Sequence, residues 1–330
     1  MNRRVTQGIA GVGIIVFIVV IAVAVWATLN RQYIADQIAV WQYQPSAEIA
    51  QIANDAGMNE TGKFYYYASH PKLDSTSNFN EDCRRKEQGN AILGCYKAGK
   101  IYLYDIDDER LRGVKEVTAA HEMLHAVYER LSAADKRNIN ALLTNEEKKI
   151  TDDAFRERME YYRRNQPGQH HNELHSIIGT EVADIAPELE AYYKKYFSDR
   201  KKVTALHARY SHKFDELQQG SMSLRQQLEQ LSVKINTATR HYNQAIAALN
   251  SDIASFNNRA QSGAFSSQGA FTSERNALVA RTRQLDSRRA AIDADIREYE
   301  AKRVAHNQLV DESNSLQQAL DSSLAPAPSL

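Results

Sequence analysis

The residues best suited to chemistry are two histidines and a glutamate: His121, Glu122 and His125. The surrounding segment, residues 117–128, has good helix formers and apolar residues at helical spacing, which predicts a helix. His121 and His125 are one turn apart on such a helix, so both imidazoles project from one side and can hold a Zn²⁺ ion. Glu122 can then take a proton from water at the metal. The alternative is a pair of ordinary histidines on an amphipathic helix, which would leave buried polar groups without partners.

A catalytic zinc needs a third protein ligand and one open position. No third histidine follows at the short spacing of the metzincins. A second helix is predicted over residues 172–184, with Asn172 as its N-cap and two glutamates and an aspartate on one side: Glu173, Glu181 and Asp184. We expect Glu181 to be the third ligand, with Glu173 as the near-equal alternative and the other carboxylate in a supporting position.

The histidine segment resembles that of the glutamate zincins, or gluzincins, a family of zinc metallopeptidases. The resemblance implies that His121 and His125 bind the zinc and that Glu122 is the general base. It also implies a glutamate ligand on a later helix. Zincins of this type further require a hydrogen-bond donor for the tetrahedral intermediate, and His175 is the best candidate. Its side of the predicted helix differs from that of the two glutamates.

The second helix resembles the gluzincins less closely. Asn172-Glu173 with Ser176 is similar to the N-E-x-x-S-D segment of thermolysin-like enzymes, but Ile177 stands where the aspartate would be. Glu181 with Asp184 is closer to the E-x-x-A-D pattern of membrane-associated zincins, with a spacing one residue short. The resemblance covers about residues 40–200 and is specific only at the histidine pair.

The N-terminal residues predict a membrane anchor. A basic head, residues 1–7, precedes an uncharged stretch, residues 8–29, which is long enough to cross a bilayer of roughly 30 Å as a helix. Arg3 and Arg4 before this stretch, against Arg31 after it, predict a cytoplasmic N-terminus and an extracytoplasmic remainder. A small-x-small site within the stretch leaves signal cleavage as the alternative, but its length favours an uncleaved signal-anchor.

Residues 30–200 are expected to form the zincin-like domain, an α+β unit. The pattern predicts a capped helix over residues 46–57, an aromatic strand over 63–68 and a hairpin of 92–96 with 101–106. A small sheet therefore precedes the predicted ligand helix. In zincins the edge strand of such a sheet pairs with an extended peptide substrate.

Composition and cysteine content limit the partners and the compartment. Lys and Arg number 41, equal to Asp and Glu, and neither a polybasic patch nor a glycine-rich phosphate loop is present, so nucleic acid is not an expected partner. Cys83 and Cys95 both follow the predicted anchor and are close in sequence. They are expected to form a disulfide in an oxidising compartment, with two free buried thiols as the alternative.

The C-terminal residues 201–322 predict a coiled coil. Apolar residues follow heptad spacing over residues 224–256 and again over 278–316, on either side of a Ser/Gly/Asn-rich stretch, residues 257–269. Two such arms predict an antiparallel hairpin, with a parallel homodimer as the alternative. Residues 323–330 are expected to be a disordered tail.

Together these patterns predict a single-pass membrane protein with an extracytoplasmic zinc metallopeptidase domain. Its substrate would be a protein or peptide, and its coiled coil would bind a protein partner or a second copy. A different class of function is a non-catalytic envelope scaffold that acts through the coiled coil. Hydrolysis of cell-wall amide bonds would use the same site residues.

Overall fold

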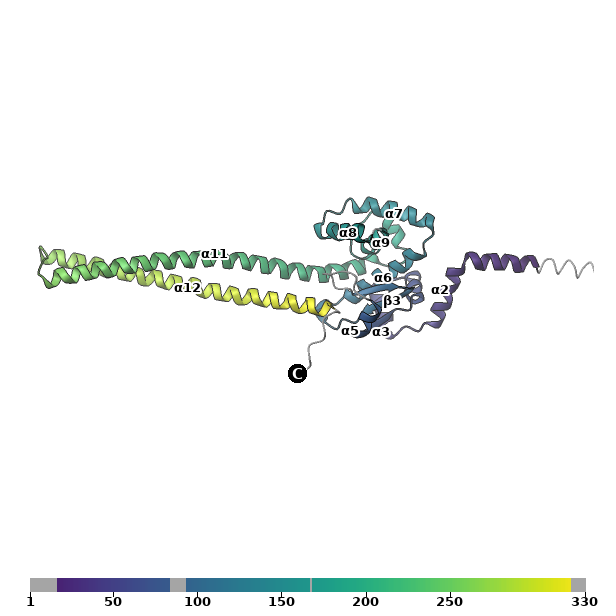
Figure 1. Cartoon of the computed structure of the whole chain (residues 1–330), viewed down its shortest axis with the longest axis horizontal. Helices are drawn as coiled ribbons and strands as arrows, with labels where there is room; N and C mark the ends of the chain where they lie inside the picture. The colour runs from purple at the N-terminus through teal and green to yellow at the C-terminus, as the bar shows by residue number, and fades with distance from the viewer. Residues whose placement is uncertain (1–16, 84–92, 167, 322–330) are drawn as a thin grey trace, which may run out of the picture. The chain divides into compact units, whose positions relative to one another are not determined.

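The computed structural model describes residues 17–83, 93–166 and 168–321 (Figure 1). Most of these residues are helical, with one small sheet and a long pair of helices, as the sequence predicted in outline. The chain divides into two compact units, one of residues 1–212 with 316–330 and the other of residues 213–315. The predicted basic head, residues 1–7, and the predicted tail, residues 323–330, lie outside the described residues.

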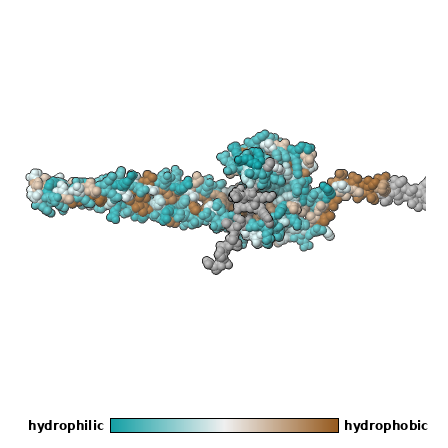
Figure 2. Space-filling model, viewed as in Figure 1, coloured by the Kyte–Doolittle hydropathy of each residue, from teal (hydrophilic) through white to brown (hydrophobic). Residues whose placement is uncertain are grey.

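Two helices begin the described part of the chain: Phe17–Leu29 and α2 (Arg31–Gln42), with a bend of 77° between them. Residues 8–16 of the predicted anchor lie outside the described residues. Within the residues that are described, no single helix is both long and apolar enough to cross a membrane, and this bent pair meets the requirement only when taken together. The side chains of Phe17–Leu29 form a continuous hydrophobic surface (Figure 2).

Side-chain caps start the next two helices. Ser46 accepts a hydrogen bond from a first-turn amide of α3 (Ala47–Asp55), which confirms the predicted capped helix. Asn59 accepts two such bonds at the start of α4 (Glu60–Ala68). The prediction of a strand over residues 63–68 was therefore wrong. The cap, together with packing of the aromatic side chains against α2 and α6, overrides their β propensity.

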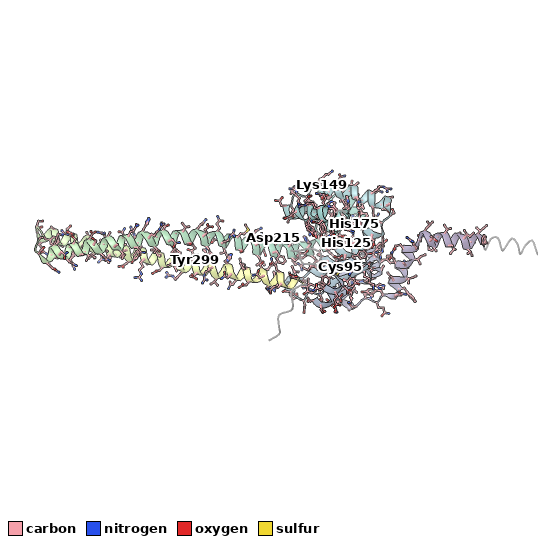
Figure 3. The ribbon with its side chains drawn as sticks, in the orientation of Figure 1. Cys95, His125, Lys149, His175, Asp215 and Tyr299 are labelled. Carbon is pink, nitrogen blue, oxygen red and sulfur yellow. A yellow bond between two sulfur atoms is a disulfide. The ribbon has the colours of Figure 1, made fainter. Side chains whose placement is uncertain are left out.

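A three-stranded sheet has the order β1-β3-β2. Its strands are β1 (Lys72–Asp74), β2 (Gly94–Lys97) and β3 (Lys100–Tyr104). β3 pairs parallel with β1 and antiparallel with β2, so β2 has one free edge within this sheet. Ala98 and Gly99 turn the hairpin with φ values of 50° and 78°, as the sequence predicted. Cys95 of β2 (Figure 3) is bonded to Cys83 at the end of α5 (Thr76–Asp82), which confirms the predicted disulfide.

The central helix of the first unit is α6 (Val114–Arg130), which contains the predicted helix 117–128. The sheet packs against it through β2 and β3, and α9 (His170–Thr180) makes its most extensive contact. The surrounding elements are α7 (Ala133–Glu147), α8 (Asp153–Asn165), α10 (Pro187–Tyr193) and the short helix η1 (Glu109–Leu111). Buried side chains such as Met123, Leu124 and Ile177 fill the core between α6 and α9.

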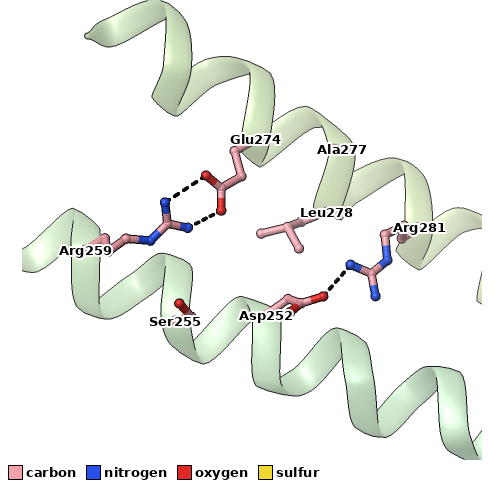
Figure 4. Close-up of a pocket in the computed structure, with 7 residues that line it drawn as sticks. All are labelled: Asp252, Ser255, Arg259, Glu274, Ala277, Leu278 and Arg281. Atoms are coloured by element: carbon pink, nitrogen blue, oxygen red, sulfur yellow. Dashed lines mark hydrogen bonds and ion pairs between the residues drawn. The ribbon is translucent and has the colours of Figure 1, made fainter. Parts of the chain in front are cut away.

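The long helices α11 (Arg200–Gln261) and α12 (Gln268–Leu320) pair antiparallel in the second unit. Phe256 and Leu278 are buried between them at the predicted heptad positions. Arg259 pairs with Glu274, and another ion pair joins the two helices nearby (Figure 4). The first turns of α11 instead belong to the first unit, so the division after residue 212 falls later than the predicted domain boundary at residue 200.

Candidate metal centre

α6 brings the three predicted site residues together. One donor atom from each of His121, Glu122 and His125 lies within 4.8 Å of the other two, and the imidazole ring centroids are 4.7 Å apart. The His121 side chain is 20% exposed and the His125 side chain only 9%. The histidine pair therefore lies at the border of the core, and His121 is the more exposed to solvent of the two. Figure 3 labels His125 on this helix.

α9 supplies a carboxylate to the same place. Oε2 of Glu173 lies 3.6 Å from Nε2 of His121 and 3.6 Å from Nε2 of His125. A zinc ion with bonds of about 2.0–2.1 Å separates its tetrahedral ligand atoms by about 3.3–3.4 Å, close to these distances. Burial alone would raise the pKa of Glu173, but His125 and His121 outweigh it, so the pKa is lowered and the carboxylate form is favoured. Although burial opposes the shift, Glu173 in turn raises the pKa of His121. A bound metal ion would displace the imidazole protons, and two neutral imidazoles with one carboxylate are a donor set that suits zinc.

Asn172 orients one of the two imidazoles. Its Nδ2 donates to Oε1 of Gln169 at 3.0 Å, so its Oδ1 is left to accept a hydrogen bond from Nδ1 of His125, also at 3.0 Å. His125 then carries its proton on Nδ1 and presents the lone pair of Nε2 toward Glu173. The prediction of Asn172 as an N-cap was wrong, because α9 begins at His170 and Asn172 lies within its first turn.

Glu122 lies between the histidine pair and the sheet. Its side chain is buried, and burial raises the pKa of the carboxyl group, although the two histidines oppose this shift. The backbone amide of Tyr96 in β2 donates a hydrogen bond to it. Gly94 permits the close approach of β2, since a Cβ atom there would lie 2.5 Å from Thr118 Cγ2 and 3.0 Å from Glu122 Cγ. The free edge of β2 is thus held against the candidate base.

Glu181, the residue preferred as third ligand, is bound elsewhere. Arg158 of α8 donates to both its carboxylate oxygens, at 3.2 and 2.5 Å, and Nε2 of His207 lies 3.4 Å away. Burial would raise the pKa of Glu181, but Arg158 outweighs it and the pKa is lowered. Glu181 follows the end of α9, eight residues or about 12 Å along the axis from Glu173. Only the first turn of α9 lies beside the histidine pair, so the preference for Glu181 disagrees with this placement.

The helix α9 is shorter than the helix predicted over residues 172–184, so its side chains do not include all three predicted acidic residues. α9 stops at Thr180, so Asp184 lies beyond it in an irregular segment instead of continuing the face of Glu173. The spacing of acidic residues over 172–184 was consistent with one long helix. Gly179, next to the observed end at Thr180, was the local signal of a helix end that this prediction did not use.

His175 is not placed for the predicted catalytic role. Its side chain is fully buried, its Nε2 lies 2.9 Å from the hydroxyl of Tyr192, and its ring packs against Tyr128 and Tyr193. Burial lowers the pKa of His175 to about 3, so the imidazole is neutral. Two residues along a helix rotate a side chain by about 200°, which turns His175 away from the side that carries Glu173. The prediction that it stabilises an oxyanion therefore has no support in this geometry.

The sequence did not identify the charged group beside the site. Arg158 and Glu181 form an ion pair, and His207 and Tyr210 from the first turns of α11 adjoin it. This group acts on the site electrostatically, because Glu181 favours protonation of His121 and Arg158 favours ionisation of Glu173. Arg158 was not among the predicted site residues, and His207 belonged to the predicted coiled coil. No spacing in the sequence links them to the histidine pair.

Comparison of the chain with protein families, curated proteins and solved structures finds no match. The resemblance of the histidine segment to the gluzincins therefore stays a prediction. What the site can do is inferred from the placement and chemistry of its own side chains, which fit a zinc ion.

Proposed function

We propose that this chain is a zinc-dependent peptidase that is attached to a membrane by its N-terminal residues and acts on the extracytoplasmic side. The observation that carries the proposal is the Glu173 oxygen at 3.6 Å from Nε2 of both His121 and His125, with Glu122 beside them. Residues of two helices, 48 or more positions apart, meet there with the donor types and separations of a three-ligand zinc site.

His121, His125 and Glu173 would hold the metal. Zinc, when bound, supplies a Lewis acid and lowers the pKa of water toward neutrality. Glu122 takes the proton of the attacking water and passes it to the leaving amine. Its burial keeps the carboxyl pKa raised, which suits a group that must both accept and return a proton. Burial would raise the pKa of Glu173, but Arg158, which is paired with Glu181, contributes to lowering it and so supports the carboxylate form of the proposed third ligand.

The edge of β2 supports a peptide as the substrate in preference to other amides. Among the described residues β2 is paired on one side only, and the amide of Tyr96 on its other side contacts Glu122. An extended peptide can pair with such an edge through its backbone, which would place a peptide bond next to the base. The disulfide between Cys83 and Cys95 anchors β2 at this position.

Attachment to a membrane is supported by the N-terminal helix Phe17–Leu29. Its apolar side chains are exposed, including Phe17 at 66% and Leu29 at 80%, and the residues before it continue the uncharged stretch predicted over residues 8–29. The disulfide is consistent with an oxidising compartment outside the cytoplasm.

The substitution Glu122→Gln tests the catalytic proposal. The full-length chain is purified in detergent with zinc and incubated with a mixture of peptides, and new termini are identified by mass spectrometry. We expect wild-type protein to cleave and Glu122→Gln to lose cleavage while it retains one zinc per chain. Glu157→Gln, which alters an exposed glutamate on α8, is the matched control and should cleave normally. Equal cleavage by wild type and Glu122→Gln would refute the assignment of the base.

The second candidate function is a scaffold that binds zinc or peptide without turnover. The extended antiparallel pair of α11 and α12 favours it, because such a rod suits a spacer or a partner-binding role. The same experiment separates the two candidates. Zinc bound at one per chain without any cleavage by wild type would support the scaffold.

A further inference from the structure

α2 is fixed to the rest of the first unit along one face. Asp36 on this face is buried and accepts hydrogen bonds at 2.9 and 2.8 Å from the guanidinium of Arg130, the last residue of α6. Farther along, Nε2 of His70 lies 2.9 Å from the carbonyl oxygen of Ala39. Because α6 also carries the histidine pair, the orientation of α2 is tied directly to the helix of the candidate metal centre.

Another face of α2 is exposed and mostly apolar, with large aromatic and aliphatic side chains. Trp41 is 84% exposed, Tyr33 53% and Ile38 49%. At 100° per residue these three side chains fall within an arc of about 140° that excludes Asp36. Gln37 also lies within this arc and donates a hydrogen bond to the Tyr33 hydroxyl, and Arg31, the first residue of α2, borders the arc. Asp36 lies outside it, so the arc itself contains no charged side chain. Large exposed aromatic residues without neighbouring charge are unusual on a surface that contacts only water.

The exposed face of α2 directly follows the hydrophobic helix Phe17–Leu29. Leu29, at the junction, is 80% exposed, and Trp26 one turn earlier is 55% exposed. The 77° bend is close to a right angle. If the first helix enters the bilayer along its normal, α2 then runs nearly parallel to the membrane surface. Tryptophan and tyrosine are the residues enriched at the depth of the lipid headgroups.

We infer that the exposed face of α2, formed by Tyr33, Ile38 and Trp41, lies in the headgroup region of a lipid bilayer. α2 is then an interfacial helix. Through the Asp36–Arg130 pair it holds α6, and with it the candidate metal centre, in one orientation relative to the membrane surface. This inference rests on the membrane attachment proposed above. A lipid surface is favoured over a protein partner because the face is uncharged and continuous with the hydrophobic helix.

The chain has two tryptophans, one in each helix, and this allows a direct test. Trp26→Phe leaves only Trp41, and Trp41→Phe leaves only Trp26. Each full-length variant is reconstituted in phosphatidylcholine vesicles whose acyl chains carry bromine either near the glycerol or near the terminal methyl group. Bromine quenches tryptophan fluorescence only at close range, so the two lipids report the depth of each side chain. Both substitutions keep an aromatic ring at an exposed position, so we expect each variant to fold as the wild type does.

We expect Trp41 to lose more fluorescence with bromine near the glycerol than with bromine near the methyl end. Trp26 should be quenched in either lipid and so reports membrane attachment independently. Quenching of Trp26 without quenching of Trp41 would overturn the inference while leaving the attachment intact, and would point to water or a protein on this face. Stronger quenching of Trp41 by the deeper bromine would also overturn it, because α2 would then continue into the hydrocarbon. If neither tryptophan is quenched, the attachment and the inference both fail.

Discussion

Glu173 and Glu181 are two glutamates near opposite ends of one helix, and only one of them faces the histidine pair. We therefore expect Glu173→Gln to weaken zinc binding strongly and Glu181→Gln to leave it nearly intact. The two substitutions make the same chemical change and preserve side-chain size. They differ in what the carboxylate contacts, which is His121 and His125 for Glu173 and Arg158 for Glu181.

The size of the effect follows from the number of ligands. Zinc binding to structural sites is worth about 10–16 kcal/mol, so one of three protein ligands contributes about 3–5 kcal/mol if the shares are equal. Glutamine keeps a neutral carbonyl oxygen, so the lower part of this range applies and the affinity should fall about 10²-fold or more. Glu181→Gln changes only a supporting charge and should cost at most about tenfold. Its main effect is to unpair Arg158, which is partly exposed, at a cost to stability of about 1 kcal/mol.

The measurement is zinc affinity of the full-length chain by competition with a fluorescent chelator, together with metal content by mass spectrometry. His121→Ala is the positive control for loss of binding. Circular dichroism of each variant shows that a loss of zinc is not a loss of fold. Wild-type affinity in Glu173→Gln, or a greater loss in Glu181→Gln than in Glu173→Gln, would refute the assignment of Glu173.

Three further outcomes follow from the structure. Asn172→Ala removes the acceptor that orients an imidazole and should lower zinc affinity about 10–100-fold in the same competition assay; unchanged affinity would show that the orientation is irrelevant. Replacing both Cys83 and Cys95 by serine removes a crosslink of sequence separation 12 and should lower the free energy of unfolding, measured in urea, by about 3 kcal/mol. A reducing agent should cause the same loss in the wild type and no further loss in the variant. Burial raises the pKa of Tyr66 and Tyr193 above the ordinary value of 10.0, so above that pH the folded chain retains protons that the unfolded chain releases. The free energy of unfolding should thus be fully maintained below pH 10 and fall as the pH rises further, and a flat profile in urea titrations to pH 11.5 would contradict the burial of these phenols.

Features that depend on residues close in sequence could be predicted from the sequence. Helical spacing alone placed His121 and His125 on one side of α6, and Ala98-Gly99 specified the turn of the hairpin. The nearness of Cys83 and Cys95 in sequence was enough to predict their disulfide. In each case the geometry is determined over a few bonds, where backbone sterics and hydrogen bonding leave few alternatives.

The tertiary structure decided what each side chain faces across an interface between elements. Glu173 and Glu181 were nearly equivalent in sequence, and only the packing of α9 on α6 places Glu173 at the histidine pair and Glu181 at Arg158. The same packing places Asn172 as the hydrogen-bond partner of His125, where the sequence had predicted the N-cap of the helix. The rotation and the axial offset of one helix against another depend on the summed packing of many side chains, which no local spacing records. For this chain, sequence spacing placed the two histidines of the candidate metal centre, and helix packing selected the carboxylate that lies beside them.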